Sequence, residues 1–454
     1  MTYNTPSRLS GSIRTRLARG LTSLVLCASL TLPALAQEPD ASPEPEPTPV
    51  SEASPAENPA ENPSENLQPA EPSASPQQPH IGGSNITAFT RNLLGNTTVG
   101  GYFDTDFNFP QNEAAFFDQH HLILQVSSIL HDRLFFNTEI EFEHGGVLGE
   151  GTNDGELRIE QAFLDYQILE SLILRVGALL VPVGRLNVLH DADFRDTVGR
   201  PLFNQVIVPT TWTETGAGFY GTLSPDQNWD INYEAYVVQG LTDHFSASDG
   251  LREARPSLAA DNNNAKAFTA RVGASPFIGL DFGLSTYLAP FSDDAKKSLG
   301  LFAGDFSWSW GPFELLGEAG VTMHDPTPDL GGEEEEEGEA DAPAGMLNGP
   351  MWGYYLEAHY HLFPDFLQNS FLGNDFERAV ITLFAQFSQV DTDVSQLNEH
   401  DRTRLAVGLN YRPVTNTAFK LEYQWNIENE AILGNDPSKE LANNAIVASV
   451  ATGF

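Results

Sequence analysis

The stretch TAFKLEYQWNI, residues 417–427, alternates strictly between apolar and polar side chains. The apolar positions are Phe419, Leu421, Tyr423, Trp425 and Ile427, and the positions between them are Lys420, Glu422, Gln424 and Asn426. Because successive side chains leave an extended backbone on opposite faces, the pattern predicts a β-strand with one apolar and one wet face. Either the second sheet of a β-sandwich or the lipid around a membrane barrel would cover that apolar face.

The same alternation continues along most of the chain and predicts sixteen strands of roughly ten residues each. They begin near Thr97, Phe117, Leu134, Leu157, Leu172, Thr213, Trp229, Ala265, Gly279, Ser298, Pro312, Met351, Arg378, Arg402, Thr417 and Ala442. The strand ELRIEQAFLDY is ambiguous, and its two faces stay unassigned. After residue 36 no apolar run is long enough for a membrane-spanning helix.

The connections between these strands alternate between short and long. LHDR, LES and PVTN are short turns, whereas residues 182–212, 240–264 and 323–350 make long loops. Short turns on one rim and long loops on the other are typical of an outer-membrane barrel rather than of a sandwich. One turn, FPDFLQNSFLGNDFE, is too long for this scheme, so it is either an excursion on the short-turn rim or a sign of a wrong strand count.

Aromatic residues support the membrane interpretation. Five tryptophans fall near the expected strand ends, where aromatic girdles meet the lipid headgroups; they are Trp229, Trp308, Trp310, Trp352 and Trp425. The last residue is Phe454, which resembles the C-terminal signal of outer-membrane barrels. We therefore predict an all-β, transmembrane antiparallel barrel of about 16 strands.

The N-terminal region is expected to lie outside the barrel. In residues 1–36, four arginines precede an apolar run that ends at Ala36, which is typical of an export signal peptide. Cys27 is the only cysteine and lies in that segment, so the mature chain has no disulfide or thiolate metal site. Residues 37–80 are rich in Pro, Glu and Ala and are predicted to be a disordered acidic spacer. Residues 81–454 form the predicted barrel domain.

Charge and size narrow the function. The chain has 23 Lys plus Arg and 62 Asp plus Glu, a net charge of -39, which argues against a nucleic-acid partner. No G-x-S-x-G elbow is present, and we expect neither an enzyme nor a cofactor. A ring of sixteen strands is too wide for its own side chains to fill, so it leaves an aqueous channel. The sequence predicts a porin of the Gram-negative outer membrane that contacts lipid and lipopolysaccharide and passes small ions or hydrophilic solutes.

An alternative function stays open beside the channel. The acidic spacer is also compatible with a structural tether between the outer membrane and the cell wall, which predicts a blocked lumen. Among smaller features, the acidic run from Glu333 to Asp341 is expected to be a solvated outer loop. His359 and His361 are expected to line the lumen. His120 and His121 are adjacent in a strand and should point to opposite faces, which disfavours a shared site.

Two motifs carry a resemblance to a known family. LRVGALLVPVGRLN at residues 174–187 and TWTETGAGFYG at residues 211–221 resemble the family of phosphate-selective porins O and P. The resemblance implies a trimer of sixteen-stranded barrels, in which the third external loop, about residues 182–212, folds inward and forms the constriction. In that family arginines and lysines line the passage and bind anions.

The matching segment of this chain carries charges of both signs. The candidate constriction residues are Arg175, Arg185, Asp191, Asp193, Arg195, Asp196, Arg200 and Glu214. Because selectivity follows the charges at the narrowest point, this mixture favours a general or weakly selective channel, and phosphate transport follows only from the resemblance. The loop arginines can instead pair with the loop's own aspartates and hold its shape, and we leave both roles open.

Overall fold

The computed structural model describes residues 96–145, 155–226, 229–259, 261–330, 345–376, 378–396, 400–428 and 441–454. The predicted signal peptide at residues 1–36, the spacer at residues 37–80 and the acidic run from Glu333 to Asp341 lie outside the described residues. None of the helices within these ranges is both long and apolar enough to cross a membrane.

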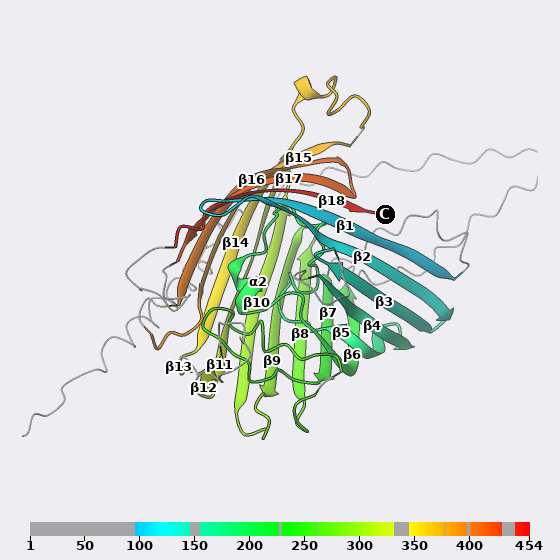
Figure 1. Ribbon diagram of the computed structural model, residues 1–454. Helices are drawn as coiled ribbons and strands as arrows, with labels where there is room; N and C mark the ends of the chain where they lie inside the picture. Colours follow the sequence, from blue (N-terminus) through cyan, green and yellow to red (C-terminus); the bar gives the residue numbers. More distant parts are fainter. Residues whose placement is uncertain are drawn as a thin grey trace, which may run out of the picture. The chain divides into compact units, whose positions relative to one another are not determined.

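Sixteen antiparallel strands close into one barrel, as predicted (Figure 1). The strands are β1 (Thr97–Pro110), β2 (Phe116–His131), β3 (Leu134–Glu143), β4 (Glu156–Leu169), β5 (Leu172–Leu180), β6 (Thr213–Asp226), β7 (Trp229–Val238), β8 (Ala267–Phe277), β9 (Leu280–Pro290), β10 (Ser298–Trp310), β11 (Phe313–His324), β14 (Met351–Leu362), β15 (Val380–Asp391), β16 (Asp401–Val414), β17 (Thr417–Ile427) and β18 (Ala445–Gly453). Each begins within about three residues of its predicted start, because the alternating pattern marks strands directly.

Closure depends on the two ends of the barrel domain. β1 pairs with β18, with Tyr102 opposite Gly453, and the last residue continues the pairing. The Phe454 N–H donates to the carbonyl of Gly101 at 2.9 Å, and the Gly101 N–H donates to the carbonyl of Phe454 at 3.2 Å. The ring therefore leaves no unpaired edge strand, which a bilayer would not tolerate.

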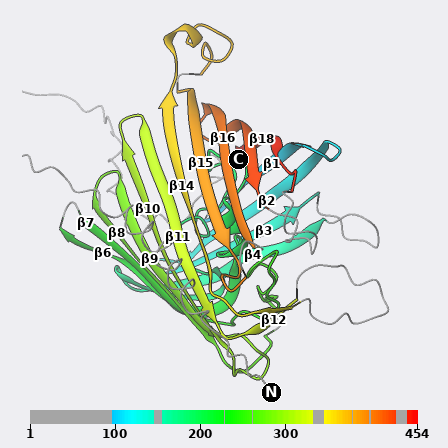
Figure 2. The same ribbon diagram turned by 90° about the vertical axis from the view of Figure 1, so that its left-hand side faces the viewer.

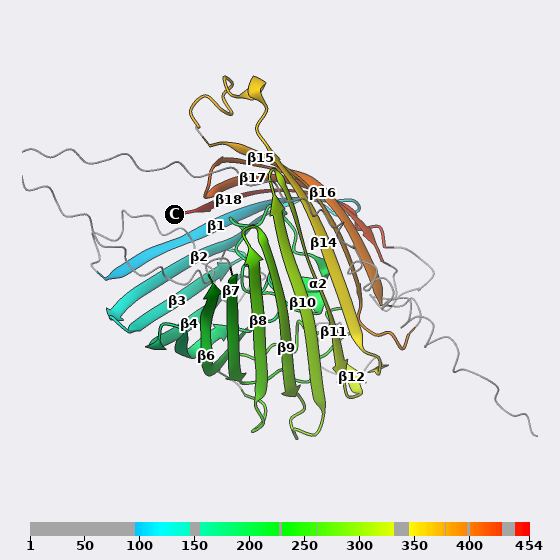
Figure 3. The same cartoon turned by 180° about the vertical axis from the view of Figure 1, so that it is seen from behind.

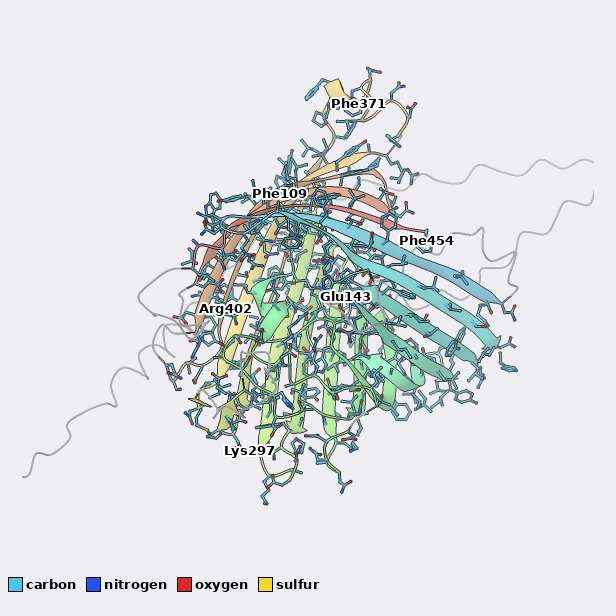
Figure 4. All side chains as sticks on the ribbon, viewed as in Figure 1. Phe109, Glu143, Lys297, Phe371, Arg402 and Phe454 are labelled. Atoms are coloured by element: carbon cyan, nitrogen blue, oxygen red, sulfur yellow. The ribbon has the colours of Figure 1, made fainter. Side chains whose placement is uncertain are left out.

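The alternation seen in the sequence sorts side chains between the two faces of the wall. On β17, Phe419 and Trp425 are 45% and 44% exposed, whereas Lys420 and Glu422 are only 4% and 1% exposed. The exposed residues face outward, and most strands repeat the pattern (Figure 4). This sorting is what a lipid environment requires. A charged side chain on a lipid-facing wall costs about 2–4 kcal/mol at the bilayer midplane, so the charged residues point inward.

A β-bulge between β3 and β4 interrupts the alternation and explains the ambiguous strand. The pairing of β3 with β4 slips between Glu139 and Ile140, so that Glu160 is inserted and both Glu160 and Gln161 are buried inside the ring. The apolar residues Ile159 and Leu164 face outward on either side of the slip. A bulge changes the phase of a strand by one residue, so no single two-residue period describes β4.

The long turn after β14 is an excursion and not a lost strand. β14 pairs directly with β15, and the residues between them carry only a short 3-10 helix, η2 (Asp365–Leu367). This segment, which contains Phe371, projects from the barrel rim (Figures 2 and 4). A separate two-stranded sheet of β12 (Thr327–Asp329) and β13 (Gly345–Leu347) belongs to the long connection between β11 and β14. The predicted number of barrel strands is therefore confirmed.

Candidate functional site in the barrel lumen

Residues 181–212, which connect β5 to β6, are called loop 3. They include the short helix α2 (Leu202–Val206), which packs against β14, β15 and β16 on the far side of the ring (Figure 1). Apolar residues of loop 3 form a buried cluster with the inner faces of several strands; these residues include Val181, Val183, Phe203, Val206, Ile207 and Trp212. The strands from β6 to β11 that contribute to this cluster form the wall seen from behind in Figure 3.

The beginning of loop 3 requires a glycine. Gly184 has φ +71°, and a Cβ atom there would lie 2.2 Å from an oxygen of Glu318 on β11. The same carboxylate accepts a hydrogen bond from the backbone N–H of Leu186 at 2.5 Å and another from the Tyr355 hydroxyl at 3.0 Å. The chain therefore turns away from β5 and contacts β11 and β14 directly.

The middle of loop 3 is fixed to β17. The Lys420 ammonium group donates to the carbonyls of Ala192 and Thr197 at 2.6 and 3.0 Å. The Glu422 carboxylate accepts from the backbone N–H of Val198 at 2.6 Å. Both charged side chains belong to the alternating stretch at residues 417–427. The polar face of β17 therefore holds loop 3 in place.

Asp196 makes the most extensive attachment among the predicted site residues. Its carboxylate accepts from the Asn410 amide at 2.7 Å and from Arg412 Nε at 3.2 Å, and it lies 3.2 Å from His359 Nδ1. Burial alone would raise the pKa of Asp196, but the hydrogen bond with His359 and the charge of Arg412 lower it to about 2. Asp196 is therefore an ionised anchor to β14 and β16.

Asp191 and Asp193 lie earlier in loop 3 than Asp196. Asp191 is 3.6 Å from the neighbouring His190, whose Nε2 is 2.6 Å from a carboxylate oxygen of Glu160. Burial and the nearby charge of Asp191 raise the pKa of Asp193 to about 7. The ion pair between His190 and Glu160 attaches this part of loop 3 to β4.

Arg175 and Glu214 belong to the wall and are fully engaged there. Arg175 forms a two-pronged ion pair with Asp165, with both N–O distances 2.8 Å, and stacks 3.7 Å from the Phe163 ring centroid. Glu214 is completely buried and accepts hydrogen bonds from the Trp212 indole and the Tyr287 hydroxyl at 2.8 and 2.6 Å. Both residues hold structure and have no free charge for a solute.

The three arginines of loop 3 differ from one another. Arg195 donates to the carbonyls of His190 and Val198, so it stabilises the fold of the loop. Arg185 is half-buried, and its guanidinium makes no hydrogen bond or ion pair with any residue that the structure describes. Arg200 donates to the Thr210 carbonyl at 2.6 Å, and its Nε is buried without a partner in the described structure.

The long loop predicted at residues 240–264 completes a basic group, although its arginines were not among the predicted site residues. Loop 4, residues 239–266, packs on loop 3, and the Leu251 N–H donates to the carbonyl of Val206 at 2.8 Å. Arg252 and Arg255 of loop 4 donate to the carbonyls of Thr210 and Thr211 at 3.4 and 2.6 Å.

Arg200, Arg252 and Arg255 therefore meet at one place, which we call the arginine cluster. None of the three forms an ion pair with a carboxylate among the described residues. Burial, together with the charges of Arg252 and Arg158, lowers the pKa of Arg255 to about 9. The cluster is thus a region of uncompensated positive charge at neutral pH.

Carboxylates of β3 lie near the arginine cluster. Glu139, Glu141 and Glu143 alternate along the inner face of β3, and Glu141 lies within electrostatic range of Arg200 and Arg158. Glu139 accepts a hydrogen bond from Gln161 at 2.7 Å. The lumen therefore presents positive charge from loops 3 and 4 and negative charge from the strand wall.

Comparisons with known proteins show which sequences and structures this chain is similar to. No family model matches the chain. A protein of Aquifex aeolicus (strain VF5), described as uncharacterized, is 29% identical over 340 residues, which cover 72% of this chain and 74% of the relative.

Among solved structures, OmpF of Salmonella typhi in complex with daunomycin has a TM-score of 0.51 and 9% identity, and the match covers 79% of this chain and 97% of that chain. The outer membrane channel DcaP of Acinetobacter baumannii (TM-score 0.49, 10% identity, 79% and 97% covered) and an anion-selective porin from Comamonas acidovorans (0.48, 13%, 79% and 99%) are also similar. The barrel of this chain therefore resembles the barrels of outer-membrane porins.

Proposed function

We propose that this protein is a porin of the Gram-negative outer membrane, which forms a water-filled channel for passive diffusion of small hydrophilic solutes and ions. The observation that carries the proposal is a closed ring of sixteen strands with an apolar outer face and a charged inner face. Loop 3 forms the constriction in this proposal, because it contacts β11, β14, β16 and β17 from inside the ring.

We infer a weak preference for anions, with phosphate as a candidate solute. Arg200, Arg252, Arg255 and Arg185 are half-buried cations without carboxylate partners in the described structure, and an anion would compensate the charge of the arginine cluster. The carboxylates of β3 limit this preference, because they lie near the arginine cluster and attract cations. The resemblance of the two motifs to phosphate-selective porins O and P supports the same choice of solute.

The proposed assembly is a homotrimer surrounded by lipid and lipopolysaccharide. The resemblance to phosphate-selective porins supports the trimer. The exposed aromatic residues at the strand ends, such as Trp229, Trp308 and Trp310, support contact with lipid headgroups. Cross-linking and native mass spectrometry in detergent should give three chains per particle, and a monomer would contradict the trimer without affecting the barrel.

Planar-bilayer recording tests the channel. The purified protein should give stepwise increases of an ohmic current. In a KCl gradient, the reversal potential should shift toward the equilibrium potential of chloride. Replacing chloride with a large organic anion should reduce the current more than replacing the potassium ion with a large organic cation. Absence of conductance from correctly inserted protein would contradict the proposed function.

A matched pair of variants tests the arginine cluster. The triple change Arg200→Ala, Arg252→Ala and Arg255→Ala should shift the reversal potential toward cation preference, because the β3 carboxylates then dominate the constriction. Lys296→Ala is the control, since Lys296 lies on an exposed outer loop next to Asp294 and should leave the reversal potential unchanged. Equal selectivity in the triple variant and the wild type would contradict the role of the cluster.

A structural tether with a blocked lumen is the alternative. The observation that favours it is the apolar cluster of loops 3 and 4 inside the ring, which includes Phe203, Trp212, Phe245 and Leu251. A tether predicts silence in the bilayer experiment together with normal insertion. The same recording therefore separates the two functions.

A further inference from the structure

We propose that Asp104, His120 and His121 form a binding site for one divalent transition-metal ion, such as Zn²⁺, on the inner wall of the barrel. The site lies on β1 and β2 and includes none of the residues of the arginine cluster or of the constriction residues predicted from the sequence. One oxygen or nitrogen atom from each of the three residues lies within 4.8 Å of the others. The proposal is independent of which solute passes through the lumen.

The two histidines share a face because of a bulge, contrary to the sequence prediction that they point to opposite faces. The pairing of β1 with β2 slips between Asp104 and Asp106, so that Asp104 lies opposite His121 and Asp106 lies opposite Asp118. The inserted residue brings the ring centroids of His120 and His121 to 3.7 Å. Bulges re-aim side chains in this way and are frequent next to functional sites.

The distances fit a small tetrahedral ion. His121 Nδ1 and His120 Nδ1 lie 2.8 and 3.3 Å from the two oxygens of Asp104. Ligands about 2.0–2.1 Å from zinc at tetrahedral angles lie roughly 3.3 Å apart, so only small shifts are needed to place an ion among them. Two imidazoles and one carboxylate favour zinc and its neighbours in the first transition row over calcium or magnesium, which prefer oxygen ligands.

A second carboxylate supports the histidine that would bind through Nδ1. The other ring nitrogen, His121 Nε2, lies 3.4 Å from Glu141 and 4.0 Å from Glu143, a residue labelled in Figure 4. Metal-binding histidines usually donate their second N–H to a carboxylate, which fixes the tautomer. The wall of the barrel therefore already contains the outer partner that such a ligand needs.

The fourth position is open toward the lumen. The side chain of His120 is 28% exposed, whereas those of Asp104 and His121 are 3% and 2% exposed, so an ion can enter from the His120 side. Asp106 Oδ2 lies 3.5 Å from His120 Nδ1, and its other oxygen is buried without a hydrogen-bond partner among the described residues. Three protein ligands and one open position are typical of an exchangeable site.

The other histidine group in the lumen is a weaker candidate. Asp196, His359 and His361 also lie close together, but the Asp196 carboxylate already accepts from Asn410 and Arg412 and attaches loop 3. An ion there would compete with the attachment of the loop. This group therefore serves as an internal comparison in the test.

The test measures zinc binding to the full chain, purified in detergent without a polyhistidine tag and stripped with a chelator. Calorimetry and elemental analysis should give one Zn²⁺ per chain, with no competition from a large excess of Ca²⁺. His120→Ala and His121→Ala should each abolish the stoichiometric binding. Glu141→Gln should weaken it about 10- to 100-fold, as expected for the loss of an outer partner.

Two controls keep the test decisive. His244→Ala changes an exposed loop histidine and should leave binding unchanged. Should the alanine variants fail to fold, Co²⁺ added to the wild-type protein should give the intense visible bands of tetrahedral coordination, and Zn²⁺ should protect His120 but not His244 from chemical modification. Absence of stoichiometric zinc, unchanged binding in both His120→Ala and His121→Ala, or loss of binding in His359→Ala instead would overturn the proposal.

Discussion

The acidic and basic residues of loop 3 are used in different ways. Asp196 has three partners on β14 and β16. His190 forms a buried ion pair with Glu160 of β4. In contrast, Arg200 contacts only a backbone carbonyl, and Arg185 has no partner in the described structure. Loop 3 is attached to the wall through Asp196 and His190, whereas Arg185 and Arg200 have no carboxylate partner in the described structure.

The difference in pairing distinguishes residues of loop 3 that hold its structure from residues that are available to a solute. A buried charge without a partner costs free energy, so charges that only stabilise a fold are normally paired. Cations left half-buried beside water are available to a passing solute, and they keep their charge because arginine is difficult to deprotonate. The proposal that Arg200 and Arg185 meet the solute, while Asp196 and His190 hold the loop, can be tested at each residue.

The largest expected effect concerns the pH dependence of stability at His190. Burial alone would lower its pKa, but the carboxylates of Glu160 and Asp191 raise the pKa of His190 to about 9. Because the pKa in the folded state lies above the unfolded value of about 6.5, the stabilisation is complete below pH 6.5 and is lost as the pH rises through 9. We expect a loss of at most about 3 kcal/mol, measured by denaturant unfolding in lipid vesicles.

The variant Glu160→Gln isolates this contribution. It removes the negative partner of His190, so the decrease in unfolding free energy between pH 6.5 and 9 should become much smaller. His244→Ala, on an exposed loop, should keep the slope of the wild type. An unchanged slope in Glu160→Gln would show that the ion pair does not fix loop 3.

The next effect concerns the attachment at Asp196. Asp196→Ala leaves Arg412 Nε and the Asn410 amide without this acceptor and should cost about 2 kcal/mol of unfolding free energy. Loop 3 keeps its other attachments, but its looser middle should increase the current noise of the open channel. Asp196→Asn is the matched control, because its amide oxygen can still accept from Asn410 and Arg412. An asparagine variant as unstable as the alanine variant would show that the charge, and not the hydrogen bonds, holds the loop.

The smallest effect on stability is expected at Arg185. Its guanidinium has no partner in the described structure, so Arg185→Ala should change the unfolding free energy by no more than about 0.5 kcal/mol. The anion preference in planar bilayers should nevertheless decrease, because one free cation is lost beside loop 3. A large loss of stability with unchanged selectivity would reverse the assignment.

The sequence was a good guide where one physical rule acted alone. The contrast between lipid and water forces a two-residue alternation, and β17 follows it along its whole length. The rule failed at β4 and at His120–His121, because each contains a bulge and the phase of a strand with a bulge depends on its neighbour. Neither slip can be recognised from one strand by itself.

The candidate site was predicted less completely than the fold. The motifs around Gly177 and Gly184 identified loop 3, and its charged residues include both the attachments and two of the proposed solute contacts. Arg175 and Glu214 were assigned to the constriction, whereas the structure places both in wall contacts. Loop 4 was predicted as a long loop, but its arginines were missed, since nothing in its sequence shows that Arg252 and Arg255 meet Arg200.

The sequence by itself determined the sixteen strands, their order and, outside the bulges, the face that each side chain takes, because these depend on local alternation and on the solvent at either face. Only the tertiary structure decided which charges inside the ring are paired. Partners such as Lys420 and Thr197, or His190 and Glu160, are far apart in the chain and meet only when loop 3 enters the closed barrel.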